Sequence, residues 1–205
     1  MENLPTRLGV RETPVKYITE EEFQAIYDYA LTLKRNRERT LLMLKMLWNL
    51  GCRISELLAI QVSDVDFKNN FVSVHVLKKR QLVNKTYKTY KRRNFVNRIP
   101  ISPALSRDIE NYIQLENLDS KGPLFDIGRT RAWKLITQIT EVSIHRKVSP
   151  HAFRHGLAMT LLKNGVHPAV IQAILAHSSV NVTFNIYATV TDDMKRDALK
   201  KLEQK

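Results

Sequence analysis

The chain has 205 residues, of which 43% are hydrophobic, so it can bury the core of one large domain or two small ones. Its formal net charge is +13, from 33 basic and 20 acidic residues. This excess favours a polyanionic partner, nucleic acid first and an acidic membrane surface second, over a merely basic soluble protein. Cys52 is the only cysteine, which excludes an intrachain disulfide and fits a reducing cytosol.

The sequence shows no signal for a membrane or for secretion. Residues 1–10 carry charges and Pro5 and lack the apolar core of a signal peptide. The richest apolar stretch, residues 41–50, is interrupted by Lys45 and is far shorter than a membrane span. We therefore expect a cytoplasmic protein that faces DNA and has no membrane partner.

The first half of the chain begins with helical signals. Residues 1–17 are expected to form an irregular lead-in. Thr19 with Glu22 three residues later predicts a capping box at the start of a helix. A second helix is expected over residues 37–50, where apolar residues wrap nearly all round, so it should lie in the centre of the core. Gly51 is expected to end it.

The period then changes to that of a strand. Val72, Val74 and Val76 alternate with polar residues, which predicts a half-buried strand, and residues 95–101 form a second candidate. The segment between them is basic, contains no acid and predicts a long hairpin tip. Its basic residues are Lys78, Lys79, Arg80, Lys85, Lys88, Lys91, Arg92 and Arg93.

From residue 103 the pattern is helical again. Helices are expected near residues 103–117, 130–144, 150–163, 167–176 and 191–204. The fold class is therefore mainly α with a small antiparallel β-sheet. The expected organisation is an N-terminal lead-in at 1–17, a catalytic domain at 18–190 with a basic β-hairpin at 71–101, and a C-terminal helix at 191–205.

Two arginines are candidates for binding a phosphodiester. Arg53 follows Gly51 between two expected helices, and Arg154 lies in the first turn of a helix that opens after Pro150. Two guanidinium forks can hold the non-bridging oxygens of one phosphate and stabilise charge that develops during attack. The plain alternative for Arg53 is an internal ion pair with Glu56.

The histidines offer proton transfer. His151 and Arg154 are three residues apart on a helix and share a face, so His151 can contact the same phosphate or take a proton from a nucleophile. His151 and His155 also have a spacing that can bind metal. The zincin pattern, however, requires Glu where this chain has Ala152, and we expect no metal site.

The nucleophile is expected to be Tyr187, ten positions after His177. A free phenol has a pKa near 10, so attack at neutral pH requires a base or a cationic pocket, which arginine and histidine would supply. Seen alone, Tyr187 would be interpreted as a core tyrosine rather than as a nucleophile.

Taken together, these motifs resemble the catalytic domain of the tyrosine recombinases, the family of phage integrases and Xer-type recombinases. Residues 51–57 are similar to the family's first arginine motif, and residues 151–155 to its HxxR box. Residues 175–179 are similar to its LGHSS box, with Ala176 where glycine is usual. The resemblance covers roughly residues 17–205 and implies the fold of that catalytic domain.

The resemblance implies a mechanism. Tyr187 would attack a DNA phosphate, forming a 3′-phosphotyrosyl link, while Arg53, Arg154 and His177 contact the phosphate and His151 acts as acid and base. A hairpin lysine would protonate the leaving 5′-oxygen. Lys78 and Lys79 both fit, with Lys78 slightly favoured. No cofactor is expected, because the covalent link conserves the bond energy.

The resemblance also implies partners. The expected partners are double-stranded DNA and accessory recombination factors. The chain itself is expected to be a monomer when free and to form a homotetramer on DNA. The helix at 191–205 would dock on a neighbouring protomer or on its own domain. DNA-backbone contacts are expected from Arg80, Lys85, Lys88, Lys91, Arg92 and Arg93. Most members of the family carry an N-terminal DNA-clamp domain, which this sequence does not show before its first expected helix. The chain is therefore expected to be either a naturally short recombinase or a truncated one.

The biological outcome is left open among integration, inversion and resolution. Two alternatives share parts of this interpretation. One is a type IB topoisomerase-like or telomere-resolving enzyme, which uses the same kind of nucleophile. The other is a non-catalytic DNA-binding regulator on the same fold.

Overall fold

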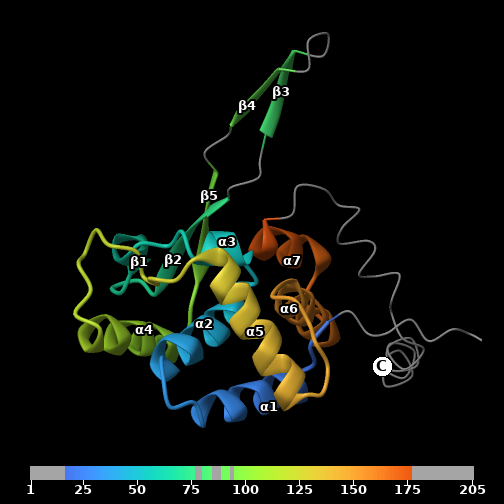
Figure 1. Ribbon diagram of the computed structural model, residues 1–205. Helices are drawn as coiled ribbons and strands as arrows, with labels where there is room; N and C mark the ends of the chain where they lie inside the picture. The colour runs from blue at the N-terminus through green and yellow to red at the C-terminus, as the bar shows by residue number, and fades with distance from the viewer. Residues whose placement is uncertain (1–16, 77–79, 85–88, 93–94, 177–205) are drawn as a thin grey trace, which may run out of the picture.

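The computed structural model describes residues 17–76, 80–84, 89–92 and 95–176. Within them the chain is mainly helical with a small antiparallel sheet, which confirms the predicted fold class (Figure 1). The helices are α1 (Glu20–Leu31), α2 (Arg37–Leu50), α3 (Ile54–Leu57), the short η1 (Val62–Asp64), α4 (Pro103–Leu115), α5 (Arg129–Ser143), α6 (His151–Lys163) and α7 (Pro168–Leu175). The strands are β1 (Val65–Asp66), β2 (Phe71–Val76), β3 (Arg80–Asn84), β4 (Thr89–Arg92) and β5 (Phe95–Pro100).

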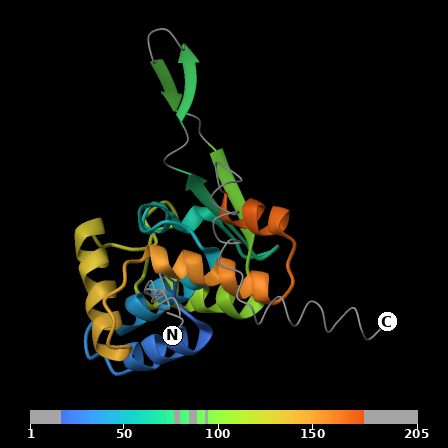
Figure 2. The ribbon, with the colours of Figure 1, turned by 90° about the vertical axis from the view of Figure 1, so that its right-hand side faces the viewer.

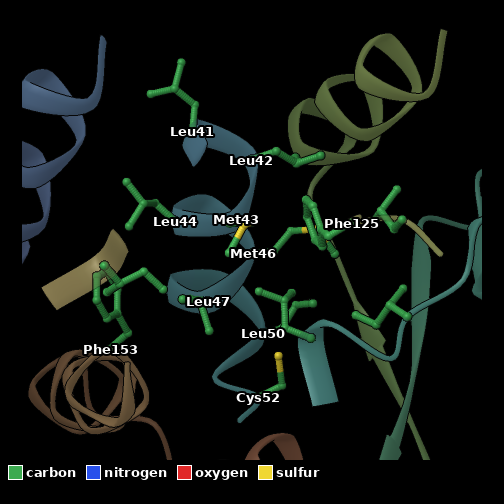
Figure 3. Packing of buried hydrophobic residues seen from close by; sticks show 14 of the residues in the cluster. Leu41, Leu42, Met43, Leu44, Met46, Leu47, Leu50, Cys52, Phe125 and Phe153 are labelled. Carbon is green, nitrogen blue, oxygen red and sulfur yellow. The ribbon is translucent and has the colours of Figure 1, made fainter. Parts of the chain in front are cut away.

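Helix α2 is the centre of the core, as predicted, and its bounds match those expected. Its side chains leave the helix on several sides, with Met46 beside Phe125 and Leu47 facing Phe153 (Figure 3). Each such buried Leu or Met contributes about 1.5–3 kcal/mol through removal of apolar surface from water. Gly51 ends α2 with a left-handed φ of +56°.

Helix α1 begins with the predicted capping box. The hydroxyl of Thr19 accepts from the Glu22 amide at 3.2 Å, and the Glu22 carboxylate accepts from the Thr19 amide at 3.0 Å. Phe23 then stacks on Trp48 of α2 with ring centroids 4.7 Å apart. These contacts fix α1 against α2 from its first turn.

The two predicted strands form the main sheet, whose strand order is β1-β2-β5 with antiparallel pairing. Val72, Val74 and Val76 are buried while His75 is exposed, which confirms the predicted alternation. The hairpin tip contains a second antiparallel pair, β3 with β4, that the sequence analysis did not predict. Figures 1 and 2 show this pair projecting from the helical body.

Helices α4 to α7 follow the predicted segments, with ends that differ by one or two residues. Helix α6 packs closely against the backbone at Ile18 through Gly156. A Cβ at that glycine would lie 2.4 Å from the backbone oxygen of Ile18, so a larger residue would not fit there. Helix α7 packs on α6 through Leu157, Leu162, Ile171 and Leu175. The predicted helix at 191–204 lies outside the described residues, and the proposed domain boundaries remain a prediction.

Candidate active site

Arg53 stands at the start of α3, where one carboxylate holds both its backbone and its side chain. Glu56 accepts from the Arg53 backbone amide at 2.9 Å and from Nη1 at 2.7 Å. Glutamate three residues into a helix commonly bonds back to the residue that caps it. The internal ion pair between Arg53 and Glu56 is therefore present. The Glu56 side chain is 3% exposed and that of Arg53 is 24% exposed, so the guanidinium is anchored but reaches the surface.

Arg154 lies in the first turn of α6, as predicted, but it is only 4% exposed. Its Nη1 donates to the carbonyl oxygen of Gly51 at 2.6 Å, and its Nη2 donates to that of Leu175. These bonds join the turn before Arg53 to the end of α7. Arg154 therefore has a structural role that its sequence motif did not indicate.

Gly51 allows this junction to be compact. Its positive φ favours glycine, and a Cβ there would lie 2.4 Å from Leu175 Cδ2 and 2.8 Å from Leu157 Cδ2. The absence of a side chain lets α7 approach the turn from which Arg53 projects.

The two guanidiniums influence each other electrostatically. Burial, followed by the positive charge of Arg53, lowers the pKa of Arg154 to about 10, while the Glu56 charge opposes the shift. Arg154 therefore remains charged at neutral pH, in a place where a second cation disfavours it. Burial, followed by the Glu56 charge, raises the pKa of Cys52 to about 12, so this thiol stays protonated.

His151 and His155 both lie on α6. His151 is exposed at the first position of the helix, and its ring meets that of His155 edge-on with centroids 5.2 Å apart. Burial, and then the charge of Arg154, lower the pKa of His155. Among the described residues, no group of three His, Cys, Asp or Glu side chains gathers as a metal site would require.

The structure thus brings Arg53 and Arg154 together at the turn of Gly51. His151 lies three residues before Arg154 on α6. The other predicted catalytic residues, Lys78, Lys79, His177 and Tyr187, lie outside the described residues. So do Lys85, Lys88 and Arg93, whereas Arg80, Lys91 and Arg92 belong to β3 and β4, of which only the backbone is described. The position of α7 is still informative, because its C-terminal cap, Ala176, directly precedes His177.

A second group of exposed basic residues, at the start of α5, was not predicted from the sequence. Arg129, Arg131 and Lys134 are exposed in the first two turns of α5, and the first turn contains no acid. Cations at a helix N-terminus are unfavourable, because the helix dipole is positive there. Helix α5 begins on the side of the body from which the hairpin projects (Figures 1 and 2). The signal was available in residues 128–134, which combine glycine with three cations and no acid.

Solved structures share this architecture. The chain superposes on a crystal structure of XerA recombinase with a TM-score of 0.70 at 23% identity, covering 90% of this chain and 64% of that one. It superposes on XerH site-specific recombinase, bound to palindromic difH substrate in a post-cleavage complex, with a TM-score of 0.71 at 16% identity, covering 93% and 54%. The fold is therefore that of the tyrosine recombinase catalytic domain.

Sequence comparison gives the family. The model for the phage integrase family matches residues 16–194, so the chain belongs to the phage integrase family. A tyrosine recombinase of Pseudothermotoga lettingae is 27% identical over 96% of this chain and 65% of its own length. Tyrosine recombinase XerA of Pyrococcus horikoshii is 30% identical over 91% of this chain and 61% of its own length. The chain therefore spans a little under two thirds of the length of these relatives. No helix in the described parts of the chain is long and apolar enough to cross a membrane.

Proposed function

We propose that this chain catalyses site-specific DNA recombination, cutting and rejoining double-stranded DNA through a 3′-phosphotyrosyl intermediate on Tyr187. The observation that carries the proposal is the convergence of Arg53 and Arg154 on the turn at Gly51. Relatives that bear the name tyrosine recombinase support it.

The electrostatics of the pair favour an anion. Arg154 bonds to carbonyl oxygens, and Glu56 pairs with Arg53 rather than with Arg154. A phosphate placed between the two guanidiniums would relieve their mutual repulsion. The attraction between this phosphate and the guanidiniums would be strongest when negative charge accumulates on the non-bridging oxygens. The pair would therefore stabilise the transition state more than the bound substrate.

In the proposed reaction the phenolic oxygen of Tyr187 forms a bond to phosphorus while the bond from phosphorus to the 5′-oxygen breaks. The phenol proton passes to His151, and Lys78 or Lys79 gives a proton to the leaving oxygen. Arg53, Arg154 and His177 hold the phosphate. The 5′-hydroxyl of another strand then attacks phosphorus, which releases Tyr187 and completes the exchange.

Two basic surfaces would hold the DNA. The first is the projecting hairpin with Arg80, Lys85, Lys88, Lys91, Arg92 and Arg93. The second is the start of α5. An unfavourable cluster of cations at a helix N-terminus becomes favourable when phosphates neutralise it. A solved relative, the Tn1549 transposon integrase, is in complex with transposon right end DNA, which supports DNA as the partner.

On DNA we propose a homotetramer assisted by accessory recombination factors, with integration, inversion or resolution as the outcome. The test is to incubate the protein with fragmented genomic DNA, denature the mixture, and sequence the fragments that stay covalently attached. Recovery of a shared site supports a site-specific recombinase. Relaxation of supercoiled plasmid without a preferred site indicates a topoisomerase instead, and binding without any covalent adduct indicates a regulator.

A further inference from the structure

The C-terminal end of α7 is held by side chains from two other elements. The Ala176 amide donates to the oxygens of Gln172 and Ala173. The Asn97 amide donates to the oxygen of Ile174 at 2.8 Å and approaches that of Ala173 at 3.4 Å, and Arg154 donates to Leu175. All four of the last carbonyl oxygens, which a helix leaves without intrahelical donors, are thereby satisfied.

Asn97 is an unusual residue for its place in β5. It lies opposite Val74 in the antiparallel register, two residues before Ile99, which lies opposite Val72. Directly opposed residues share a face of the sheet, and Val72, Val74 and Ile99 are all buried on that face. Asn97 itself is half-buried, so an apolar residue would suit position 97, and a polar group there costs free energy to the extent that it is not hydrogen-bonded. The carbonyl groups of α7 supply that bond.

The contact joins two parts of the proposed active site. Strand β5 pairs with β2, which leads directly to Lys78 and Lys79. Helix α7 ends at Leu175, and its C-terminal cap, Ala176, has a left-handed φ of 47° that is unfavourable for a residue with a Cβ. His177 follows this cap in the sequence. Figure 2 shows α7 lying beside β5 near the base of the hairpin.

We propose that Asn97 is a positioning residue of the strand-transfer reaction. It fixes the end of α7, and so the point from which His177 and the nucleophile segment depart, relative to the sheet that carries the hairpin lysines. This inference rests on the proposed function and adds a residue to it. Asn97 acts through His177 and does not itself contact DNA.

The test uses Asn97→Leu. Position 97 is half-buried beside the apolar side chains of this face, so leucine should preserve the fold, but it cannot donate to Ile174. With a DNA site recovered by covalent trapping, we expect cleavage to slow by about 10- to 100-fold while DNA affinity stays unchanged, since small displacements of catalytic groups have effects of this size. Asn97→Gln, which retains the amide, should recover part of the rate.

Asn69→Leu is the matched control. Asn69 also donates from its amide, to Asp66 at 2.9 Å, but it lies before β2 at the end of the sheet remote from the hairpin. It should cleave at the wild-type rate. Equal losses in Asn69→Leu and Asn97→Leu would overturn the proposal, as would an Asn97→Leu variant that cleaves normally.

A substrate with sulfur in place of the bridging 5′-oxygen separates the two routes by which Asn97 could act. A thiolate is a good leaving group without protonation, so this substrate bypasses the hairpin lysine. We expect Asn97→Leu to remain slow on it, because His177 is displaced. Full recovery of the rate would show that Asn97 acts through the lysine and would overturn the proposal.

Hydrogen exchange tests the contact without any DNA. Asn97→Leu should exchange faster than wild type in the peptide that contains Ile174 and Ala176, and Asn69→Leu should not. Unchanged exchange would show that Asn97 does not hold α7. If the wild-type protein forms no adduct on any DNA, the proposed function fails, and the exchange result still decides whether Asn97 fixes this helix.

Discussion

Arg154 and Gly51 are 103 residues apart, yet Nη1 of Arg154 donates to the carbonyl oxygen of Gly51 at 2.6 Å inside the protein. The same guanidinium donates to Leu175. One buried cation therefore fixes the turn from which Arg53 projects and the helix that leads to His177. The residue proposed to bind the phosphate also holds its neighbours in position.

We predict that Arg154→Lys loses both stability and activity. A lysine cannot present two donors in the planar geometry that reaches both carbonyl oxygens. Leaving one buried oxygen without a donor should lower the free energy of unfolding by about 1–3 kcal/mol. Arg53→Lys is the control, since it keeps a cation beside Glu56. It should abolish cleavage with a smaller loss of stability in urea denaturation, and an equal loss would contradict the structural role of Arg154.

Gly51→Ala should destabilise the protein more than Gly165→Ala. Both glycines have positive φ, which costs alanine about 1–2 kcal/mol. At Gly165 a Cβ meets nothing within 4 Å, whereas at Gly51 it overlaps Leu157 and Leu175. Overpacking of this kind adds about 1–3 kcal/mol. Thermal or urea unfolding measures the difference, and equal effects would show that α7 does not press against this turn.

His155 should make stability depend on pH. Its pKa in the folded protein is lowered from 6.5 by burial and by Arg154. As pH falls below about 6.5, the unfolded chain binds a proton that the folded protein takes up only at lower pH, so stability is lost on acidification. His155→Gln removes this titration. Urea midpoints between about pH 7 and pH 5 should fall less in the variant than in wild type. Parallel profiles would refute the prediction.

Neutralising the start of α5 should weaken DNA binding without harming the fold. The triple variant Arg129→Gln, Arg131→Gln and Lys134→Gln should be as stable as wild type or slightly more stable, because cations there oppose the helix dipole. The slope of log affinity against log salt should become shallower by about one for each lost phosphate contact.

A charge-matched triple variant serves as the control for α5. Arg107, Lys121 and Lys163 are also exposed but lie on or near α4 and α6. Arg107→Gln, Lys121→Gln and Lys163→Gln remove the same charge, so they should keep most of the salt dependence. If both triple variants change the slope equally, the effect is one of net charge and α5 is not a DNA surface.

Local patterns predicted the elements well. The apolar run of α2, the Thr19 capping box and the alternating valines of β2 each depend on neighbouring residues, so the sequence alone determined them. The β3–β4 pair was missed because its charged sequence lacks the apolar alternation by which strands are recognised. The family resemblance directed attention to Arg53 and Arg154, although neither motif indicates by itself that the two converge.

Contacts between distant segments could not be predicted. Nothing near Arg154 in the sequence indicates that Gly51 and Leu175 accept its hydrogen bonds. Asn97 likewise looks like an ordinary polar strand residue until β5 is paired with β2 and α7 is placed beside it. Such roles depend on tertiary packing, which local periodicity does not encode.

The most direct test of the account is to identify the residue that becomes linked to DNA. The protein is reacted with a nicked substrate that prevents religation, digested, and the DNA-bearing peptide is sequenced by mass spectrometry. The account predicts a phosphodiester on Tyr187, complete loss of the adduct in Tyr187→Phe, and unchanged DNA affinity in that variant. A covalent adduct that persists in Tyr187→Phe, or that maps to another residue, would contradict it.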